Sequence, residues 1–171
     1  QKHHVYQQYP LGQSLMAGSQ TPCDLLSIQH DVIRAYKQAL EGPIRDYLSH
    51  IGTEEAHPLT TRNQGGYQFA GCWSVVLTSG GRHVNHVHPE GWISSAYYVQ
   101  VPDEVGDPEG RPGWIKFGEP PFPMPGSSGP EKWIQPRPGT LVLFPSYLWH
   151  GTEPIKDGST RITAPFDLKP S

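Results

Sequence analysis

The sequence predicts a mainly β domain, in which a sandwich or barrel of short strands follows one amphipathic helix. Beyond residue 65 the chain alternates short runs rich in Val, Ile, Tyr, Trp and Thr with turns, and no helical period is present there. Glycine and proline are frequent, with 19 of each among 171 residues, which is typical of many turns and not of a helical bundle. This length suits a single domain, 1–171, with a buried core.

The N-terminal part is predicted to contain a loose segment and then the helix. Residues 1–20 are polar and rich in Gln, and we expect a loose N-terminal segment there. Residues 21–51 are predicted to be helical, because Thr21-Pro22 offers an N-cap and a first-turn proline. Gly42-Pro43 is expected to end or kink this helix. The apolar residues at helical spacing are Leu25, Ile28, Val32, Tyr36 and Ala39.

Residues 65–168 are predicted to form the barrel core. The segment 102–138 holds 16 of the glycines and prolines, so we expect it to be mostly irregular. Because irregular surface over a β scaffold often carries substrate contacts, residues 102–135 are either a lid or a plain crossover loop. The predicted strands are Tyr67–Thr78, Val84–His88, Trp92–Val101, Trp114–Phe117, Lys132–Gln135, Thr140–Phe144 and Arg161–Leu168.

Charge and hydropathy exclude two classes of partner. The formal net charge is −3, so there is no basic field to hold a nucleic acid or an acidic membrane surface. No window approaches the roughly 18–20 apolar residues of a membrane span, and the N-terminus lacks a secretory signal. Two cysteines, Cys23 and Cys72, are too few for a disulfide scaffold, and reduced thiols are expected. We therefore expect a cytoplasmic protein, with a small-molecule or peptide substrate that the sequence does not identify.

Three of the nine histidines stand where the predicted elements bring them together. His86 and His88 are two apart on a predicted strand, so their side chains project from the same face. Two such imidazoles can bind one divalent metal at about 2.0–2.2 Å. His150 follows an apolar strand and a proline turn. It is the natural third ligand, because distant segments are often neighbours in an antiparallel barrel.

Other arrangements of this site stay open. His83 has the opposite parity to His86 and is expected to lie outside the metal ligands, unless a bulge intervenes. Glu90 has the parity of His88 and could be the third ligand in its place, although the flanking proline and glycine indicate that the chain turns away. Alternatively, His86 and His88 pair with acids or water on a solvated face, with no metal.

Four parts of the sequence together resemble a known family. The motif His86-x-His88, the runs from Ser95 to Pro102 and from Gly139 to His150, and the motif Arg161-x-Thr163 resemble the iron(II)- and 2-oxoglutarate-dependent oxygenases. They are most similar to a bacterial branch with a His-x-His-Pro motif. The resemblance covers residues 65–168 and implies a double-stranded β-helix, that is, a jelly-roll or cupin-like barrel. It also implies an enzyme that uses Fe(II), 2-oxoglutarate and O₂ to hydroxylate a C–H bond with release of succinate and CO₂.

The resemblance also assigns roles to residues. Arg161 would bind the remote carboxylate of 2-oxoglutarate, with Thr163 hydrogen-bonding beside it and Tyr98 directed at the same group; a guanidinium fork fits a carboxylate with two parallel bonds. Otherwise Arg161 is a strand-edge cation and Thr163 a simple β-former. Position 88 is Asp or Glu in the wider superfamily, and a histidine there leaves the iron centre one unit more positive. The implied metal ligands are His86, His88 and His150.

Two other functions compete with the oxygenase. One is a cupin-like three-histidine metalloenzyme without 2-oxoglutarate, because the spacing of Gly139, Pro145 and His150 also resembles the second cupin motif. Cupins expect a glutamate four or five residues after the His-x-His pair, however, whereas Glu90 comes two residues after His88. The other is a non-catalytic jelly-roll binding domain in which the histidines are incidental and no metal binds tightly.

Overall fold

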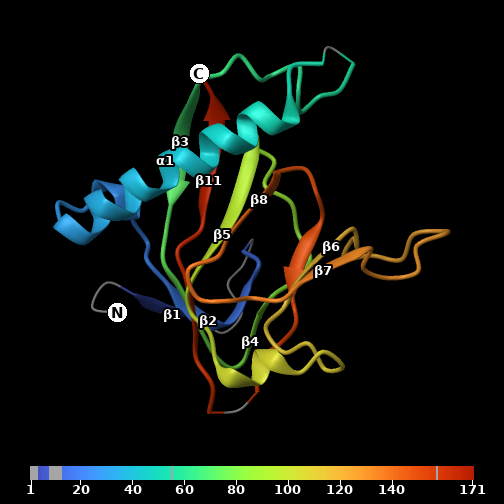
Figure 1. The fold of residues 1–171 in the computed structure, drawn as a ribbon. Coiled ribbons are helices and arrows are strands. Elements are labelled where there is room, and N and C mark those ends of the chain that lie inside the picture. The colour runs from blue at the N-terminus through green and yellow to red at the C-terminus, as the bar shows by residue number, and fades with distance from the viewer. Residues whose placement is uncertain (1–3, 8–12, 55, 157) are drawn as a thin grey trace.

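The computed structural model describes residues 4–7, 13–54, 56–156 and 158–171 (Figure 1). None of the helices in these ranges is long and apolar enough to cross a membrane. In chain order the elements are β1 (Val5–Gln7), β2 (Leu15–Gln20), η1 (Leu25–Ser27), α1 (Asp31–Ile51), β3 (Tyr67–Cys72), β4 (Val75–His83), β5 (Ile93–Gln100), η2 (Asp103–Gly106), β6 (Ile115–Phe117), β7 (Lys132–Ile134), β8 (Leu141–Pro145), β9 (His150–Thr152), β10 (Arg161–Thr163) and β11 (Phe166–Pro170).

The larger sheet runs in the order β1-β2-β4-β10-β5-β11-β3, and β8 pairs with β5. Strands β3 and β4 follow each other almost without a break, as do β10 and β11, and the two pairs run antiparallel to each other. The interruptions meet at Trp73 and Pro165, where the Trp73 N–H donates to the Pro165 carbonyl at 3.1 Å. As a result, β11 and β10 pair with successive parts of β5, at the centre of the sheet.

The smaller sheet, in the order β7-β6-β9, faces the larger one. Phe117 of β6 and Phe144 of β8 meet edge to face with ring centroids 5.0 Å apart, in a buried cluster between the sheets. Two antiparallel sheets packed over a shared core make a β-sandwich, the architecture to which jelly rolls belong. The predicted mainly β fold, a double-stranded β-helix, is therefore confirmed. The buried members of the cluster are Tyr98, Ile115, Phe117, Val142 and Phe144.

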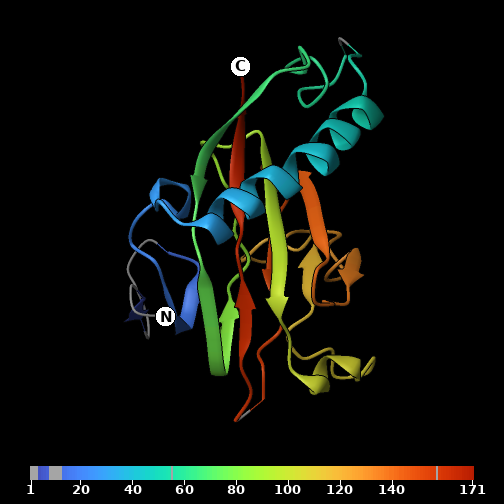
Figure 2. The ribbon, with the colours of Figure 1, turned by 60° about the vertical axis from the view of Figure 1, so that its left-hand side comes forward.

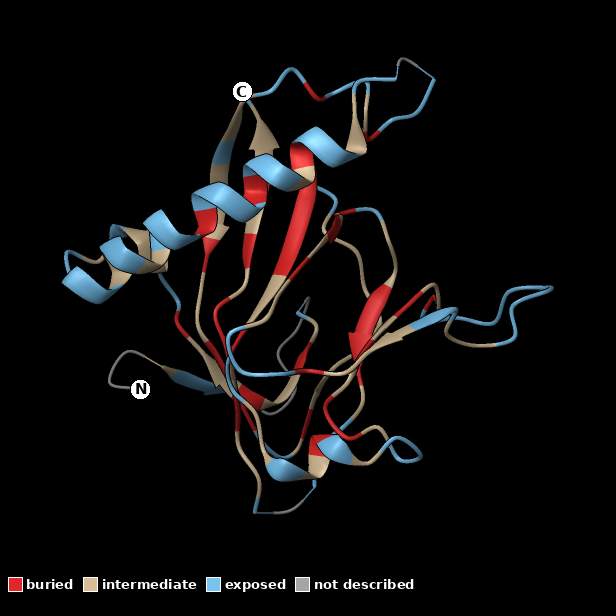
Figure 3. Cartoon of the chain, in the orientation of Figure 1, coloured by how far each residue is buried: buried red, intermediate tan, exposed pale blue. Residues whose placement is uncertain are grey.

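Helix α1 covers the outer face of the larger sheet, crossing β3, β11 and β5 (Figure 2). Leu40, Ile44 and Leu48 are four residues apart, so they form one buried stripe. Figure 3 shows buried positions, in red, recurring along α1 where it crosses the strands. Phe166 and Leu168, on the outward face of β11, pack against this helix. The alternate residues of β11 are thereby turned toward the interior of the barrel.

The helix begins at Asp31 and not at Thr21, so the prediction for residues 21–30 was wrong. The Thr21 hydroxyl accepts a hydrogen bond from the Ser74 N–H at 3.0 Å, and the Asp24 carboxylate accepts one from the Cys72 N–H at 3.1 Å. These bonds hold the segment at the sheet edge, where only the short 3₁₀ helix η1 forms.

The helix does not end at Gly42-Pro43 but continues to Ile51 with Pro43 inside it. A proline within a helix removes one backbone hydrogen bond and costs roughly 3 kcal/mol. The neighbouring Ile44 is fully buried and Leu48 nearly so. Burial of two such side chains contributes about 1.5–3 kcal/mol each, which offsets the cost of the proline.

Several strand predictions need correction. Residues 84–88 form no regular strand, because the Val84 N–H donates to the Ser14 carbonyl and the His88 N–H to the Ser146 carbonyl. The runs 67–78 and 161–168 are each split into two strands. Within the segment expected to be loose, residues 15–20 form β2, which pairs with β4; residues 1–3 and 8–12 of that segment lie outside the described residues.

The segment 102–138 contains the two predicted strands, which pair with each other as β6 and β7. Strand β6 also pairs with β9, and its Ile115 lines the interior cavity. Residues 121–128 are exposed, and the connection between β6 and β7 projects away from the barrel in Figure 1. Part of the segment that was expected to be a lid or a crossover loop therefore forms a wall of the barrel and is followed by an outward loop.

Candidate functional site

His86, His88 and His150 come together inside the barrel, as predicted. One ring nitrogen from each lies within 4.8 Å of the others, and the Nε2 atoms of His86 and His88 are 3.0 Å apart. The backbones of His86 and His150 also pair, because each N–H donates to the other's carbonyl oxygen, at 2.9 and 3.0 Å. Two segments far apart in sequence are thus joined at the histidines themselves.

A glycine permits this close approach. Gly151, next to His150, is buried, and a Cβ atom at this position would clash with the Asn85 side-chain oxygen. The same Cβ would lie 3.0 Å from the carbonyl oxygen of His83. A larger residue would therefore push the His150 strand away from the segment that carries His86.

The three imidazoles share one orientation. Each Nδ1 faces a carbonyl or carboxylate oxygen to which it can donate, so each Nε2 is left for another partner. The Nε2 atoms of His86 and His88 are 3.0 Å apart, close enough for one cation to bind both. The Nδ1 partners are the Val84 carbonyl for His86 (2.8 Å), the Leu148 carbonyl for His150 (3.0 Å) and the Asp167 carboxylate for His88 (2.6 Å).

Electrostatics keep two of these rings neutral. Burial, reinforced by the neighbouring His88, lowers the pKa of His86 to about 4. Burial, reinforced by His86, lowers the pKa of His150 to about 3. Both rings are therefore uncharged at neutral pH, and the neutral imidazole is the form that ligates a metal. An all-nitrogen set of this kind suits Fe, Ni, Cu or Zn.

The two alternative ligands stand apart from the three histidines. Glu90 is exposed and is not in the three-histidine group. The ring of His83 stacks beside that of His86 at 6.0 Å, and its Nδ1 lies 3.0 Å from the Ser14 hydroxyl. Burial is the main cause that lowers the pKa of His83 well below its usual value, so this ring too is neutral. His83 lines the cavity without being one of the three.

Arg161 is a buried cation without an anion. Only 3% of the residue is exposed; its Nη1 donates to the Gly113 carbonyl at 2.6 Å, and its Nε has no hydrogen-bond partner. Among the described residues no acidic side chain forms an ion pair with it. Burial lowers the pKa of Arg161, and an unpaired buried charge is costly. The site therefore favours an anion that arrives from the cavity.

Tyr98 stands beside this arginine. The Arg161 Cζ lies 5.6 Å from the centroid of the Tyr98 ring, and the Tyr98 hydroxyl is buried with no hydrogen-bond partner. Burial raises the pKa of Tyr98, and Arg161 only partly opposes this shift, so the hydroxyl stays protonated and can donate. Tyr97 points the opposite way and packs on Tyr36, at 5.2 Å. Thr163 is buried near Arg161, on the same cavity.

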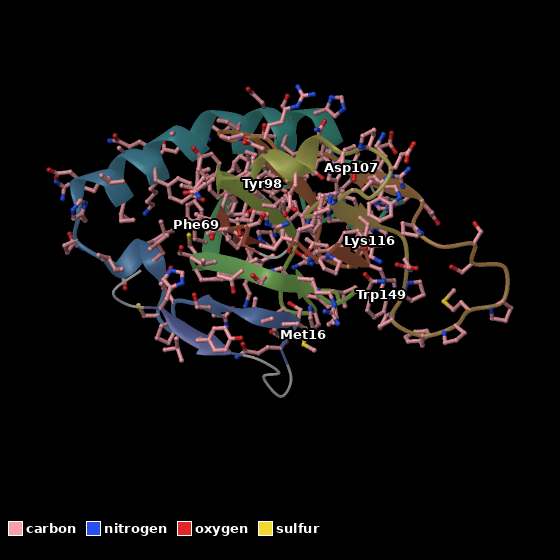
Figure 4. The ribbon with its side chains drawn as sticks, turned by 90° about the horizontal axis from the view of Figure 1, so that it is seen from below. Met16, Phe69, Tyr98, Asp107, Lys116 and Trp149 are labelled. Carbon is pink, nitrogen blue, oxygen red and sulfur yellow. The ribbon has the colours of Figure 1, made fainter. Side chains whose placement is uncertain are left out.

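One cavity of about 630 Å³ connects the three histidines with Arg161, Thr163 and Tyr98. Figure 4 shows Tyr98 among the interior side chains, beneath the helix. The apolar residues Ala96, Ile115 and Phe144 form part of its wall, and residues of the segment 13–24 line another part. All six predicted site residues therefore face a single space.

Two contacts at this site were not predicted. Asp167 bonds His88, and Trp73 stacks on the same ring with centroids 6.1 Å apart and planes 23° apart. The contact of Asp167 had a signal in the sequence. Arg161, Thr163 and Asp167 are separated by even numbers of residues on one predicted strand, and such residues share a face. No sequence signal distinguished Trp73 from the other tryptophans.

Comparison with known families finds a match. The model of the family described as "Putative 2OG-Fe(II) oxygenase", where 2OG is 2-oxoglutarate, matches residues 71–167, which is more than half of the chain. This span contains every residue predicted for the metal and co-substrate site. A comparison with curated protein sequences finds no match.

Comparison with solved structures supports the fold. A prolyl-4-hydroxylase from Pseudomonas putida is 16% identical, with 99% of this chain and 78% of that one covered and a TM-score of 0.61. HygX from Streptomyces hygroscopicus, solved with nickel and 2-oxoglutarate bound, is 14% identical, with 97% and 74% covered and a TM-score of 0.58. The chain spans 44% of a 2OG-Fe(II) oxygenase family oxidoreductase from Burkholderia pseudomallei, with 61% of this chain covered, 13% identity and a TM-score of 0.47. The family match, on a barrel that gathers these residues, shows that the chain belongs to the 2OG-Fe(II) oxygenase family.

Proposed function

We propose that this chain is an Fe(II)- and 2-oxoglutarate-dependent dioxygenase that hydroxylates a C–H bond of a small molecule or peptide, with release of succinate and CO₂. The observation that carries the proposal is the buried Arg161, which has no acidic partner among the described residues and shares one cavity with three converging histidines. A cation site and an anion site in one cavity suit 2-oxoglutarate, which can chelate a metal at one end and offers a carboxylate at the other.

His86, His88 and His150 would hold the iron. One ring nitrogen from each converges on the same point, and a three-residue set leaves coordination positions open for other ligands. When bound, Fe(II) together with 2-oxoglutarate and O₂ supplies the oxidising power for C–H hydroxylation. The contribution of the chain is to fix these three rings, and the Nδ1 hydrogen bonds do so.

Arg161 would bind the remote carboxylate of 2-oxoglutarate. A guanidinium offers two parallel N–H donors to a carboxylate, and burial strengthens such a pair because water does not compete. The Tyr98 hydroxyl and the Thr163 hydroxyl would add hydrogen bonds from either side. The unpartnered Arg161 Nε and Tyr98 Oη both gain a partner in this arrangement.

The organisation around the site follows the same proposal. Residues 1–171 would act as one oxygenase domain, with the apolar side chains of Ala96, Ile115 and Phe144 limiting the water that reaches the metal. Cys23 and Cys72 are both free thiols, in keeping with the expected cytoplasmic location.

An anaerobic titration tests the proposal. Protein loaded with Fe(II) is titrated with 2-oxoglutarate while the visible metal-to-ligand charge-transfer band is followed. We expect the band in the unmodified protein, no band in His150→Ala, and a need for far more 2-oxoglutarate in Arg161→Ala. The exposed Arg137 provides the matched control, and Arg137→Ala should titrate like the unmodified protein.

Two other outcomes would contradict the proposal. Iron that binds without giving a band at any 2-oxoglutarate concentration would favour the cupin-like three-histidine metalloenzyme. Failure to bind any divalent metal tightly would favour a non-catalytic jelly-roll domain, in which His86, His88 and His150 have no ligand role.

A further inference from the structure

Asp167 makes the strongest polar contact to the three-histidine group. Its Oδ2 accepts a hydrogen bond from the His88 Nδ1 at 2.6 Å, and both side chains are mostly buried, 16% and 18% exposed. The other carboxylate oxygen, Oδ1, is buried without a hydrogen-bond partner. Of the three Nδ1 acceptors, this is the one that carries a full negative charge.

The fold holds this carboxylate rigidly. Asp167 lies on β11, between β3 and β5, where it pairs with Gly71 on one side and Ser94 on the other. Its neighbours Phe166 and Leu168 are fully buried on the opposite face, under helix α1. Because alternate strand residues point to opposite faces, this burial forces the Asp167 side chain toward the cavity.

His88 is in turn restrained from three directions. Its backbone N–H donates to the Ser146 carbonyl at 2.9 Å, Trp73 stacks on its ring, and Asp167 holds its Nδ1. The ring can then present only Nε2 to a metal. His88 lies on a segment without regular secondary structure, so these contacts replace the rigidity that a strand would have provided.

Besides orienting His88, Asp167 can supply negative charge near the proposed metal. Three imidazole ligands bring no negative charge to a divalent cation. We propose that Asp167 is a positioning residue of the metal centre, which orients His88 and places one carboxylate charge a single imidazole away from the metal. A carboxylate on the far nitrogen raises the basicity of a ligating imidazole, and loss of such a partner typically lowers metal affinity about 10–100-fold.

This inference rests on the proposed function, and its test uses a readout other than catalysis. Co(II) is titrated into the metal-free protein, and its visible ligand-field spectrum reports both affinity and ligand geometry. Asp167→Asn keeps the shape and an acceptor oxygen but removes the charge; Asp167→Ala removes both. Asp46→Asn, on the exposed side of α1, removes the same charge far from the cavity.

We expect Co(II) to bind about 10-fold more weakly to Asp167→Asn and up to about 100-fold more weakly to Asp167→Ala, with a shifted spectrum in both. The double variant His88→Asp/Asp167→Asn moves the carboxylate onto the metal itself, and should bind Co(II) more tightly than Asp167→Asn alone. Asp46→Asn should match the unmodified protein.

The failures of the two proposals are distinguishable. If the unmodified protein binds no Co(II), the metal site of the proposed function is wrong. If it binds Co(II), and Asp167→Asn does so within about twofold and with the same spectrum, the role of Asp167 is wrong while the metal site stands. If Asp167→Asn does not fold, Asp167→Glu is titrated with Co(II) in its place. One added methylene displaces the oxygen that holds His88, and an unshifted Co(II) spectrum would again overturn the inference.

Discussion

At the scale of single residues, the geometry of Arg161 matters as well as its charge. A lysine at this position keeps the positive charge but has no planar fork for a carboxylate. We expect Arg161→Lys to weaken 2-oxoglutarate binding roughly 10–100-fold, the loss of about one charge-assisted hydrogen bond. Metal binding should not change, because among the described residues Arg161 forms no hydrogen bond with His86, His88 or His150. The charge-transfer titration measures the co-substrate affinity.

The exposed Arg137 again provides the control for this substitution. Arg137→Lys should leave the 2-oxoglutarate affinity unchanged. An Arg161→Lys variant that binds 2-oxoglutarate as well as the unmodified protein would show that this arginine is only a strand cation.

The two thiols should differ sharply in reactivity. Cys72 is buried in the core under α1, and burial, the main cause, raises its pKa to about 12. At pH 8 its thiol is therefore protonated and unreactive, since the thiolate is the nucleophile. Cys23 is exposed. We expect Ellman's reagent to label one thiol rapidly in folded protein and two in denaturant, and Cys23→Ser to abolish the rapid phase. Two rapid thiols in the folded protein would place Cys72 outside the core.

At the scale of elements, the junction between β9 and the segment after β4 depends on one glycine. Gly151→Ala introduces a Cβ against Asn85 and the His83 carbonyl, and overpacking of this kind costs about 1–3 kcal/mol. Gly42 offers a matched control, because nothing lies within 4 Å of an added Cβ in α1. Gly42→Ala should raise the free energy of unfolding by about 0.5–1 kcal/mol. Urea denaturation measures the free energy of unfolding of both variants. A Gly151→Ala variant as stable as the unmodified protein would contradict the close approach of Gly151 to Asn85 and His83.

The same scale shows what periodicity could predict. Residues 140–144 and 92–101 are rich in apolar and aromatic residues and are bounded by turn residues, so β8 and β5 were found within a residue or two. Strand β2, Leu15–Gln20, lacks β-branched residues and forms because β4 offers it a partner. Thr21-Pro22 was expected to cap a helix. The Thr21 hydroxyl does accept a backbone hydrogen bond, but the donor is the Ser74 N–H, which lies beside the sheet and not in a helix.

At the scale of the whole molecule, the site was more predictable than the elements that carry it. His86 and His88 meet although they lie in no regular strand. Backbone N–H groups of their segment donate to the carbonyls of Ser14, Ser146 and His150, and these hydrogen bonds fix its path. Such bonds join residues distant in sequence, and spacing along the chain does not reveal them. The alternation of Arg161, Thr163 and Asp167 could have placed Asp167 on the site face, but its bond to His88, 79 residues away, is of the kind that spacing does not reveal.

The most direct measurement is a crystal structure of the protein grown without oxygen in the presence of Fe(II) and 2-oxoglutarate, with the metal located by anomalous scattering at the iron edge. We expect one iron site bonded at about 2.0–2.2 Å to Nε2 of His86, His88 and His150, with the remote carboxylate of 2-oxoglutarate on Arg161. Iron bound elsewhere, or 2-oxoglutarate bound away from Arg161, would contradict the proposed metal centre and co-substrate site.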